Sequence, residues 1–202
     1  MGNRLVIGTD LDGVIIRHVT AILAACEQQK VPLLAEETNS NLFRSKVGDA
    51  FYRAVADWLY REGTYQGEQV RGAFPVLWRL KSSWRVIVVS ARHPDAVPFA
   101  QTWLGDQEFH QKTGIGREDV FFCAEEQKGV ILVRERAQVY IDDKLSVLEG
   151  LPPDILRIFF DPFCLVRHGI LQPPAGIVVA TRWIDIEHII VQRFSQPQGV
   201  TA

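Results

Sequence analysis

The sequence contains little of what marks secreted, membrane-spanning or nucleic-acid-binding proteins. Only three of its 202 residues are cysteines, and Cys26, Cys123 and Cys164 have no close spacing, so we expect neither a zinc site nor a disulfide framework. We expect each to be a small buried side chain in a protein of a reducing compartment, the cytoplasm. No apolar run is long enough for a signal-peptide core or a membrane span. The formal net charge of −2 argues against a general binder of nucleic acid or of a membrane surface.

What the sequence does contain is enough apolar material for a substantial core. Apolar residues make up 47% of the chain, which is ordinary for a globular protein. The length of 202 residues fits one domain, or one domain with a sizeable insert.

The most informative stretch is the short apolar run over residues 5–9, which ends in Asp10-Leu11-Asp12-Gly13. The run is typical of a buried strand in a parallel sheet. Ligands of such sheets lie outside the carboxyl ends of the strands, where Asp10 and Asp12 would emerge. Two carboxylates at one strand end repel each other, and Mg²⁺ would relieve this while leaving room for a phosphate. Gly13 would let the backbone turn and leave N–H groups free to face an anion.

Two other interpretations of this stretch compete. A calcium loop of the EF-hand kind needs a Glu at its twelfth position, which counting from Asp10 is Ala21, and it follows a helix rather than a strand. A plain turn that uses Asp and Gly for turn chemistry is the commoner alternative. On this stretch alone, turn and site are about equally favoured.

Hydrophobic periodicity predicts an alternation of strands and helices along most of the chain. Further strands are expected over residues 84–90, 120–123, 137–141, 155–160 and 177–180. Helices are expected over residues 19–29, 40–61, 68–81, 94–104, 125–136 and 183–194, although part of 125–136 would also suit a strand. Pro75 would kink the third helix or move its start. The tail from Ser195 is expected to fray.

This alternation predicts an α/β fold with a Rossmann-like, mainly parallel sheet flanked by helices. The helical stretch over 17–80 interrupts the alternation after the first strand. We therefore expect a core made of residues 1–16 and 81–202, and a small helical cap of residues 17–80 over the carboxyl edge of the sheet. A cap is useful where a reaction must exclude water or select a substrate.

Polar side chains also follow two later strands. Ser90 ends one strand, Asp142-Asp143 end another, and Lys128 lies in the connection before the latter. An Asp pair can simply cap a helix, and most lysines are solvated. One Asp suffices for a cap, however, and four aspartates gathered at one edge of a sheet would be costly without a cation.

These pieces, in this order, resemble the four motifs of the haloacid dehalogenase superfamily. The resemblance rests on Asp10-Leu11-Asp12-Gly13-Val14, on Ser90 after Val86-Ile87-Val88-Val89, on Lys128, and on Asp142-Asp143 after Tyr140-Ile141. It covers the chain from the first strand to about residue 148, and its first and last motifs are the specific ones. More narrowly, Ile141-Asp142-Asp143-Lys144, Lys128-Gly129, the helical insert and Trp183 resemble the deoxyribonucleotide 5′-nucleotidases.

The resemblance implies a Mg²⁺-dependent phosphatase that works through an aspartyl-phosphate. Asp10 would be the nucleophile, and Asp12 the general acid and base. The implied metal ligands are Asp10, Asp12 through its backbone carbonyl, Asp142 and Asp143. The implied phosphate-binding groups are Ser90, Ala91, Lys128 and the backbone N–H groups of Leu11 and Gly13.

Selectivity for a substrate is less clearly marked. Arg92 departs from the nucleotidase pattern and would either reach an anionic group or be a solvated loop residue, whereas His93 is expected to be structural or exposed. Phe43 and Tyr52 in the insert could stack on a base. The spacing of Phe51, Val55, Trp58 and Leu59 instead favours a core stripe.

We therefore expect a phosphatase of small phosphomonoesters, with nucleotide 5′-monophosphates as one substrate class. The alternatives are a phosphatase for a sugar phosphate, a phosphoprotein or a nucleic-acid end, and a protein of this fold that binds a ligand with little turnover. The expected partner is a small phosphorylated substrate, with neither a membrane nor, by the modest charge, nucleic acid. The sequence does not indicate an oligomeric state.

Overall fold

A six-stranded parallel sheet forms the centre of the structure, which is a computed structural model that describes residues 5–194. The strands are β1 (Val6–Thr9), β4 (Arg85–Ala91), β5 (Val120–Cys123), β6 (Ala137–Asp142), β7 (Leu156–Phe160) and β8 (Ile177–Ala180). Their order across the sheet is β5-β4-β1-β6-β7-β8, with every neighbouring pair parallel. This confirms the predicted Rossmann-like sheet. The chain leaves β1 toward β4 and β5, and later continues on the other side with β6, so the strand order reverses beside β1.

The central position of β1 follows from its composition. All four of its residues are buried, and Gly8 pairs with Ile87 on one side and Tyr140 on the other. A Cβ at Gly8 would lie 2.6 Å from Leu132 Cδ2 and 2.9 Å from Tyr140 Cδ2, so these side chains would have to move to make room for any larger residue.

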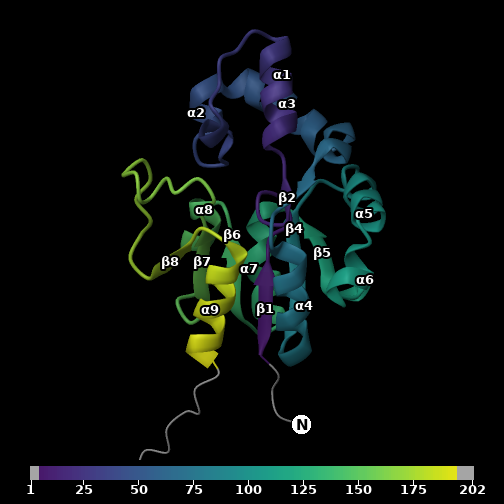
Figure 1. Cartoon of the computed structure of the whole chain (residues 1–202), viewed down its shortest axis with the longest axis vertical. Helices are drawn as coiled ribbons and strands as arrows, with labels where there is room; N and C mark the ends of the chain where they lie inside the picture. The colour runs from purple at the N-terminus through teal and green to yellow at the C-terminus, as the bar shows by residue number, and fades with distance from the viewer. Residues whose placement is uncertain (1–4, 195–202) are drawn as a thin grey trace, which may run out of the picture.

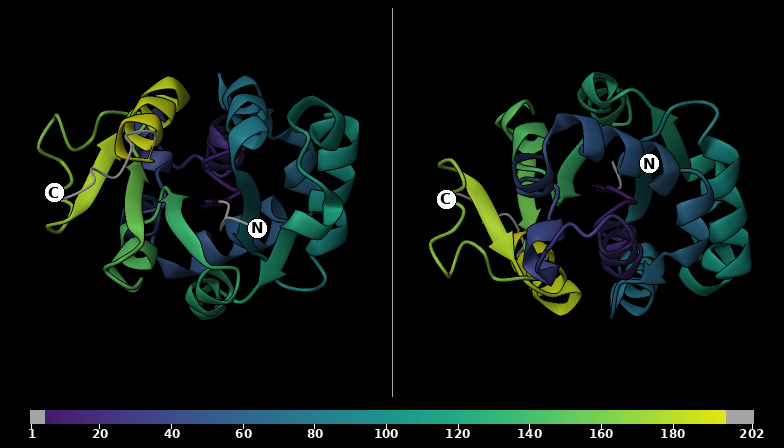
Figure 2. Two further views of the ribbon diagram at one scale, coloured as in Figure 1. Left: turned by 90° about the horizontal axis from the view of Figure 1, so that it is seen from below. Right: turned by 90° about the horizontal axis from the view of Figure 1, so that it is seen from above.

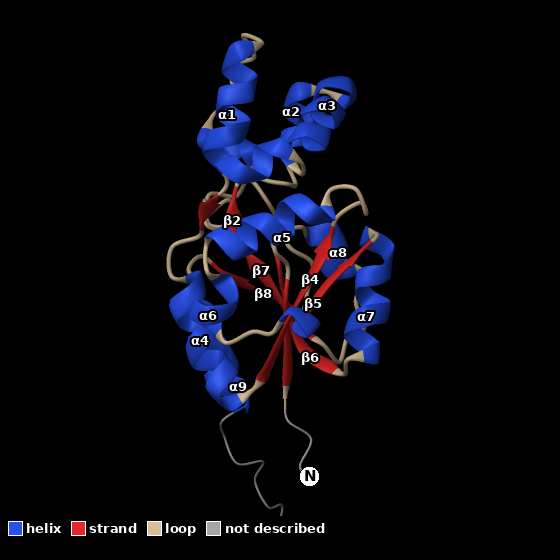
Figure 3. Ribbon diagram, turned by 90° about the vertical axis from the view of Figure 1, so that its right-hand side faces the viewer, coloured by secondary structure: helices blue, strands red, loops and turns tan. Residues whose placement is uncertain are grey.

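Helices cover both faces of the sheet (Figures 2 and 3). On one face lie α4 (Ala73–Ser83), α5 (Val97–Asp106), α6 (Phe109–Thr113) and α9 (Trp183–Phe194), whose buried side chains share one apolar cluster with the strands. On the other face lie α7 (Lys128–Arg134) and α8 (Leu145–Glu149), which contribute to a second cluster. The two faces together explain why the strands are apolar along their whole length rather than alternating.

A separate group of helices lies beyond one end of the sheet (Figure 1). It consists of α1 (Val19–Gln28), the 3₁₀ turn η1 (Ala35–Thr38), α2 (Phe43–Val47) and α3 (Asp49–Leu59). These helices share a small core of their own that includes Cys26, Phe43 and Val55. Phe51 and Trp58 pack against it, which agrees with the predicted core stripe. Most of helix α4 also falls within the predicted cap range 17–80, but this helix packs on the sheet. The exact division into core and cap stays a prediction.

Several predicted boundaries shift for local reasons. The helix expected over 40–61 is broken at Gly48, whose φ of +80° interrupts the helical backbone between α2 and α3. The helix expected from residue 68 begins at Ala73, because the strand β3 (Glu68–Gln69) pairs antiparallel with β2 (Ile16–Arg17). Pro75 therefore lies in the first turn of α4, where proline is tolerated.

Three further connections contain a short 3₁₀ turn. The turns are η2 (Glu62–Gln66), η3 (Arg117–Asp119) and η4 (Glu125–Gln127). The predicted fraying from Ser195 falls outside the described residues. Among residues 5–194, none of the helices combines the length and apolar character needed to cross a membrane. Of the three cysteines, only Cys26 is fully buried.

Candidate active site

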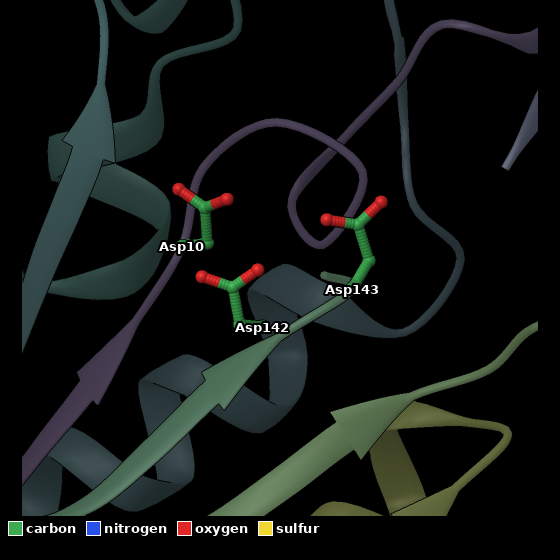
Figure 4. A group of neighbouring side chains, drawn as sticks. All are labelled: Asp10, Asp142 and Asp143. Atoms are coloured by element: carbon green, nitrogen blue, oxygen red, sulfur yellow. The ribbon is translucent and has the colours of Figure 1, made fainter. Parts of the chain in front are cut away.

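Three aspartates from neighbouring strand ends come together beside the strand-order reversal. Asp10 follows β1, while Asp142 ends β6 and Asp143 follows it, and their carboxylates face one space (Figure 4). One ligand oxygen from each lies within 4.8 Å of the others. The N–H of Asp10 donates to the Ile141 carbonyl at 2.8 Å, which ties the two strand ends together. These carboxylates thus lie at one edge of the sheet, as the sequence predicted.

Lys128 lies among these carboxylates rather than in solvent. Its side chain is 3% exposed, and its Nζ is 3.0 Å from Asp10 Oδ2 and 2.9 Å from Asp142 Oδ2. Burial alone would lower the pKa of Lys128, but the two aspartates outweigh it and raise that pKa well above the usual range. Lys128 therefore carries a fixed positive charge beside Asp10.

One buried cation does not balance this group of carboxylates. Burial raises the pKa of Asp10 well above its usual range; Lys128 opposes this, and the neighbouring aspartates add to it. Burial and the charge of Asp142 likewise raise the pKa of Asp143 to about 7. Three carboxylate donors with an excess of negative charge form a set that suits a hard divalent cation such as Mg²⁺.

Asp12 faces a different set of partners. Arg92 donates from Nη2 to Asp12 Oδ1 at 2.5 Å and from Nε to Oδ2 at 2.9 Å. His18 Nε2 lies 2.7 Å from Oδ1, and Ser90 Oγ donates to Oδ2 at 3.2 Å. Burial would raise the pKa of Asp12, but Arg92 and His18 outweigh it and hold that pKa well below its usual range. Asp12 is therefore ionised at neutral pH in this arrangement.

Arg92 is neither a solvated loop residue nor free to bind an anion as it stands. It is 2% exposed, and its Nη1 donates at 2.9 Å to the Tyr60 carbonyl and to Thr64 Oγ1. Both of these acceptors lie in the segment that follows α3. Arg92 therefore links that segment to Asp12. His93, by contrast, is exposed and bonded to Asp95, as expected.

The loop after Asp10 is shaped by Gly13 and by contacts from distant parts of the chain. Gly13 has a φ of +78°, and a Cβ there would lie 2.2 Å from Asp143 Oδ2. Trp183 is fully buried and donates from Nε1 to the Val14 carbonyl at 2.9 Å. The Gly13 N–H donates to the Ile16 carbonyl at 2.8 Å, so the prediction that it is free to face an anion is wrong. The tight turn uses that N–H internally.

The other expected phosphate-binding groups lie at the same site, with their roles still a prediction. Ser90 is fully buried and bonded to Asp12, while Ala91 lines the cavity beside it. The Leu11 N–H donates to Asp10 Oδ1 at 2.8 Å.

A cavity of about 1120 Å³ opens over the aspartates. The sheet edge and the helical group both line it, and its wall includes Phe43 and Tyr52. These two rings also touch each other, with centroids 5.7 Å apart, and Phe43 is 4% exposed. Base stacking by these rings stays a prediction, since Phe43 already belongs to the small core of the helical group.

Sequence reasoning missed several residues that position the site. One of them is His18, which contacts Asp12. Asn41 donates from Nδ2 to the Asp143 carbonyl at 2.8 Å and accepts from the Leu145 N–H at 3.0 Å. Ser40 Oγ donates to the same Asp143 carbonyl at 2.9 Å. The contacts of Ser40 and Asn41 join residues about a hundred positions apart, so no local pattern signals them.

Comparison with known proteins shows which solved structures share this architecture. No family model and no curated protein matches the sequence. Among solved structures, a haloacid dehalogenase-like family protein from Streptococcus pneumoniae shares 14% identity, with a TM-score of 0.58 over 94% of this chain and 100% of that one. A haloacid dehalogenase-like family hydrolase from Xanthomonas campestris shares 9% identity, with a TM-score of 0.58 over 96% of this chain and 98% of that one. The chain has the fold of haloacid dehalogenase-like hydrolases.

A third structure of this fold contains bound ligands. The D,D-heptose 1,7-bisphosphate phosphatase from B. bronchiseptica, complexed with magnesium and phosphate, shares 12% identity, with a TM-score of 0.56 over 94% of this chain and 99% of that one. At such identities the likeness establishes the haloacid dehalogenase-like fold of this chain, and its chemistry has to be argued from its own residues.

Proposed function

We propose that this protein is a Mg²⁺-dependent phosphatase of small phosphomonoesters and works through an aspartyl-phosphate intermediate. The observation that carries the proposal is the setting of Asp10, a buried carboxylate at the strand-order reversal, 3.0 Å from Lys128 and grouped with Asp142 and Asp143. Ligands bind at such reversal points in open α/β sheets. A phosphatase of the same fold, crystallised with magnesium and phosphate, supports this choice.

In the first step, an Asp10 carboxylate oxygen attacks the phosphorus while the bond from phosphorus to the leaving oxygen breaks. The phosphoryl group is then held on Asp10, and the alcohol leaves with the proton that its oxygen requires. In the second step, water attacks the phosphorus, which releases inorganic phosphate and restores the Asp10 carboxylate. Lys128 stabilises the negative charge that builds up on the phosphoryl oxygens.

Asp12 is proposed to carry the protons in both steps. As an ionised carboxylate it can take a proton from the attacking water, which is the role of a general base. Its role as an acid requires that it first gain a proton, and the salt bridge to Arg92 opposes this. A dianionic phosphate bound nearby raises the pKa of Asp12, because like charges favour the neutral form. An ester with a good leaving group does not need a proton from Asp12 on its leaving oxygen.

The residues that would hold Mg²⁺ are Asp10, Asp142 and Asp143, with the Asp12 backbone carbonyl as the further predicted ligand. When bound, the cation would neutralise these carboxylates and orient the phosphate oxygens. The raised pKa values of Asp10 and Asp143 fit this assignment, since both carboxylates are crowded without a cation.

The helical group formed by α1, α2 and α3 is proposed to act as the cap that selects the substrate. Its residues line the same cavity as Asp10. Nucleotide 5′-monophosphates are one class to test. Sugar phosphates are a second, favoured by the heptose bisphosphate phosphatase among the proteins of similar fold.

The proposal is tested by hydrolysis of p-nitrophenyl phosphate, with Mg²⁺ and with excess chelator. The wild-type protein should turn over only with the metal, and Asp10→Asn should be inactive. Asp154→Asn, at an exposed aspartate outside the cavity, serves as the matched control and should retain full activity. Turnover that survives both the chelator and Asp10→Asn would rule the proposal out. A protein that binds Mg²⁺ and phosphate without turnover would favour the binding alternative.

A further inference from the structure

The basic residues around the cavity differ in whether a carboxylate already neutralises them. Each of the following contacts an acidic partner within 4.0 Å: Arg17, Arg79, Arg92, Lys128, Lys144 and Arg182. Arg71 lines the same cavity and is exposed, and it has no ion pair with any residue of the described range 5–194. Among the arginines and lysines of the described cavity wall, Arg71 is therefore the one whose positive charge is not balanced by a carboxylate of the protein.

Arg71 is held close to the loop that carries the proposed catalytic residues. It directly follows Val70, whose N–H donates to the Ile15 carbonyl at 2.9 Å. The preceding strand β3 pairs with β2, where Gln69 is opposite Ile16. On the other side, Gly72 adopts a φ of +85°, and a Cβ there would lie 3.5 Å from Trp183 Cβ. Arg71 therefore projects from a backbone that is fixed on both sides.

The cavity has room for more than the scissile phosphate. Its volume of about 1120 Å³ slightly exceeds the roughly 300–1,000 Å³ typical of pockets that enclose a whole small molecule. Beyond the aspartates, the wall includes the apolar side chains of Val70, Val76 and Trp183. A substrate that fills this space would place part of its body near Arg71.

We propose that Arg71 forms a second anion subsite, so that the substrate is a phosphomonoester with a further phosphate or carboxylate away from the scissile group. This inference rests on the proposed phosphatase function and narrows its substrate class. An arginine guanidinium presents a fork of donors that matches either anion. Because Arg71 is not neutralised by a protein carboxylate, its charge is available to the substrate.

The test compares paired substrates that differ by one anionic group. Fructose 1,6-bisphosphate against fructose 6-phosphate probes a second phosphate, and 3-phosphoglycerate against glycerol 3-phosphate probes a carboxylate. Each is assayed with Mg²⁺ for wild type, Arg71→Gln and Arg71→Lys. Arg117→Gln is the control, because Arg117 is also exposed, lies outside the cavity wall and forms no ion pair within residues 5–194.

The wild-type protein should prefer the doubly anionic member of at least one pair. Arg71→Gln should lower kcat/KM for that member about tenfold, the effect of losing one charged hydrogen bond. It should leave the singly anionic member and p-nitrophenyl phosphate unchanged. Arg71→Lys should recover part of the loss, and added salt should weaken the preference. The pair that responds identifies the second group as phosphate or carboxylate.

Two results would overturn the inference in distinguishable ways. If Asp10-dependent hydrolysis of p-nitrophenyl phosphate is intact but Arg71→Gln affects both members of each pair equally, or neither, the second anion subsite is wrong and the phosphatase function stands. If p-nitrophenyl phosphate is not hydrolysed at all, or is hydrolysed equally by Asp10→Asn, the function fails and the subsite fails with it.

Discussion

The salt bridge between Arg92 and Asp12 offers the sharpest test of how the site is held together. Arg92 is 2% exposed and the Asp12 side chain 12% exposed, and two hydrogen bonds of 2.5 and 2.9 Å join them. Replacing Arg92 by Met preserves much of the apolar stem but leaves the Asp12 carboxylate without its cation. Removing one partner of a buried ion pair typically costs about 3–5 kcal/mol. We therefore expect Arg92→Met to lower the free energy of unfolding by about that amount.

A double-mutant cycle separates this charge effect from the loss of packing. Asp12→Asn in the Arg92→Met background removes the stranded charge, so the two changes together should cost about 1–3 kcal/mol less than their sum. The assay is urea unfolding of the four proteins without metal, analysed by linear extrapolation. Arg44→Met is the matched control, because Arg44 holds Asp49 through two bonds of 2.7 and 2.8 Å but is 57% exposed. It should cost at most about 1 kcal/mol. A coupling energy below about 0.5 kcal/mol would refute the reasoning.

Three further predictions follow from individual contacts. Gly13→Ala should destabilise the fold by about 1–3 kcal/mol and weaken Mg²⁺ binding in calorimetry, because the residue needs a positive φ and its Cβ would displace Asp143; unchanged affinity would contradict this. Lys128→Met should lower kcat on p-nitrophenyl phosphate by about 10²-fold or more, and a loss under threefold would be inconsistent with its role. Arg85 holds the pKa of Glu135 below its usual range by a hydrogen bond of 2.9 Å. This stabilisation is present above the unfolded pKa of about 4.3 and is lost as the pH falls through the folded value. Glu135→Gln should therefore be less stable than wild type by on the order of 1 kcal/mol at pH 7, and the gap should narrow in urea titrations below about pH 4; a gap that is independent of pH would show that the Glu135 charge does not contribute to stability.

The parts of the fold that the sequence predicted are those with local signals. The run before Asp10 is apolar on both faces and became the central strand, and Asp142 follows a run of the same kind. The carboxyl ends of parallel strands lie at one edge of the sheet. The sequence alone therefore predicted that the aspartates at these ends lie close together. Lys128 was placed by its position in the motif order, and its burial confirms that it is not a solvated lysine.

What the sequence could not predict depends on contacts between distant segments. Arg92 follows a strand and precedes His93-Pro94, a context typical of a loop, and only the fold brings it against Asp12 and the end of α3. The short pairing of β2 with β3 joins segments about fifty residues apart and delays the start of α4. At Gly48, a single residue with positive φ divides a stretch whose apolar spacing is that of one helix.

The central claim is that Asp10 carries the phosphoryl group during turnover. The most direct measurement is mass spectrometry of Asp12→Asn after acid quenching during reaction with p-nitrophenyl phosphate and Mg²⁺. This ester needs no proton on its leaving group, so the first step proceeds, whereas the second step lacks its general base and slows. The account predicts that the peptide containing Asp10 gains the mass of one phosphoryl group, and that Asp10→Asn in the same background gains none. Nitrophenol release with no phosphorylated Asp10, at a rate that Asp10→Asn does not change, would contradict it.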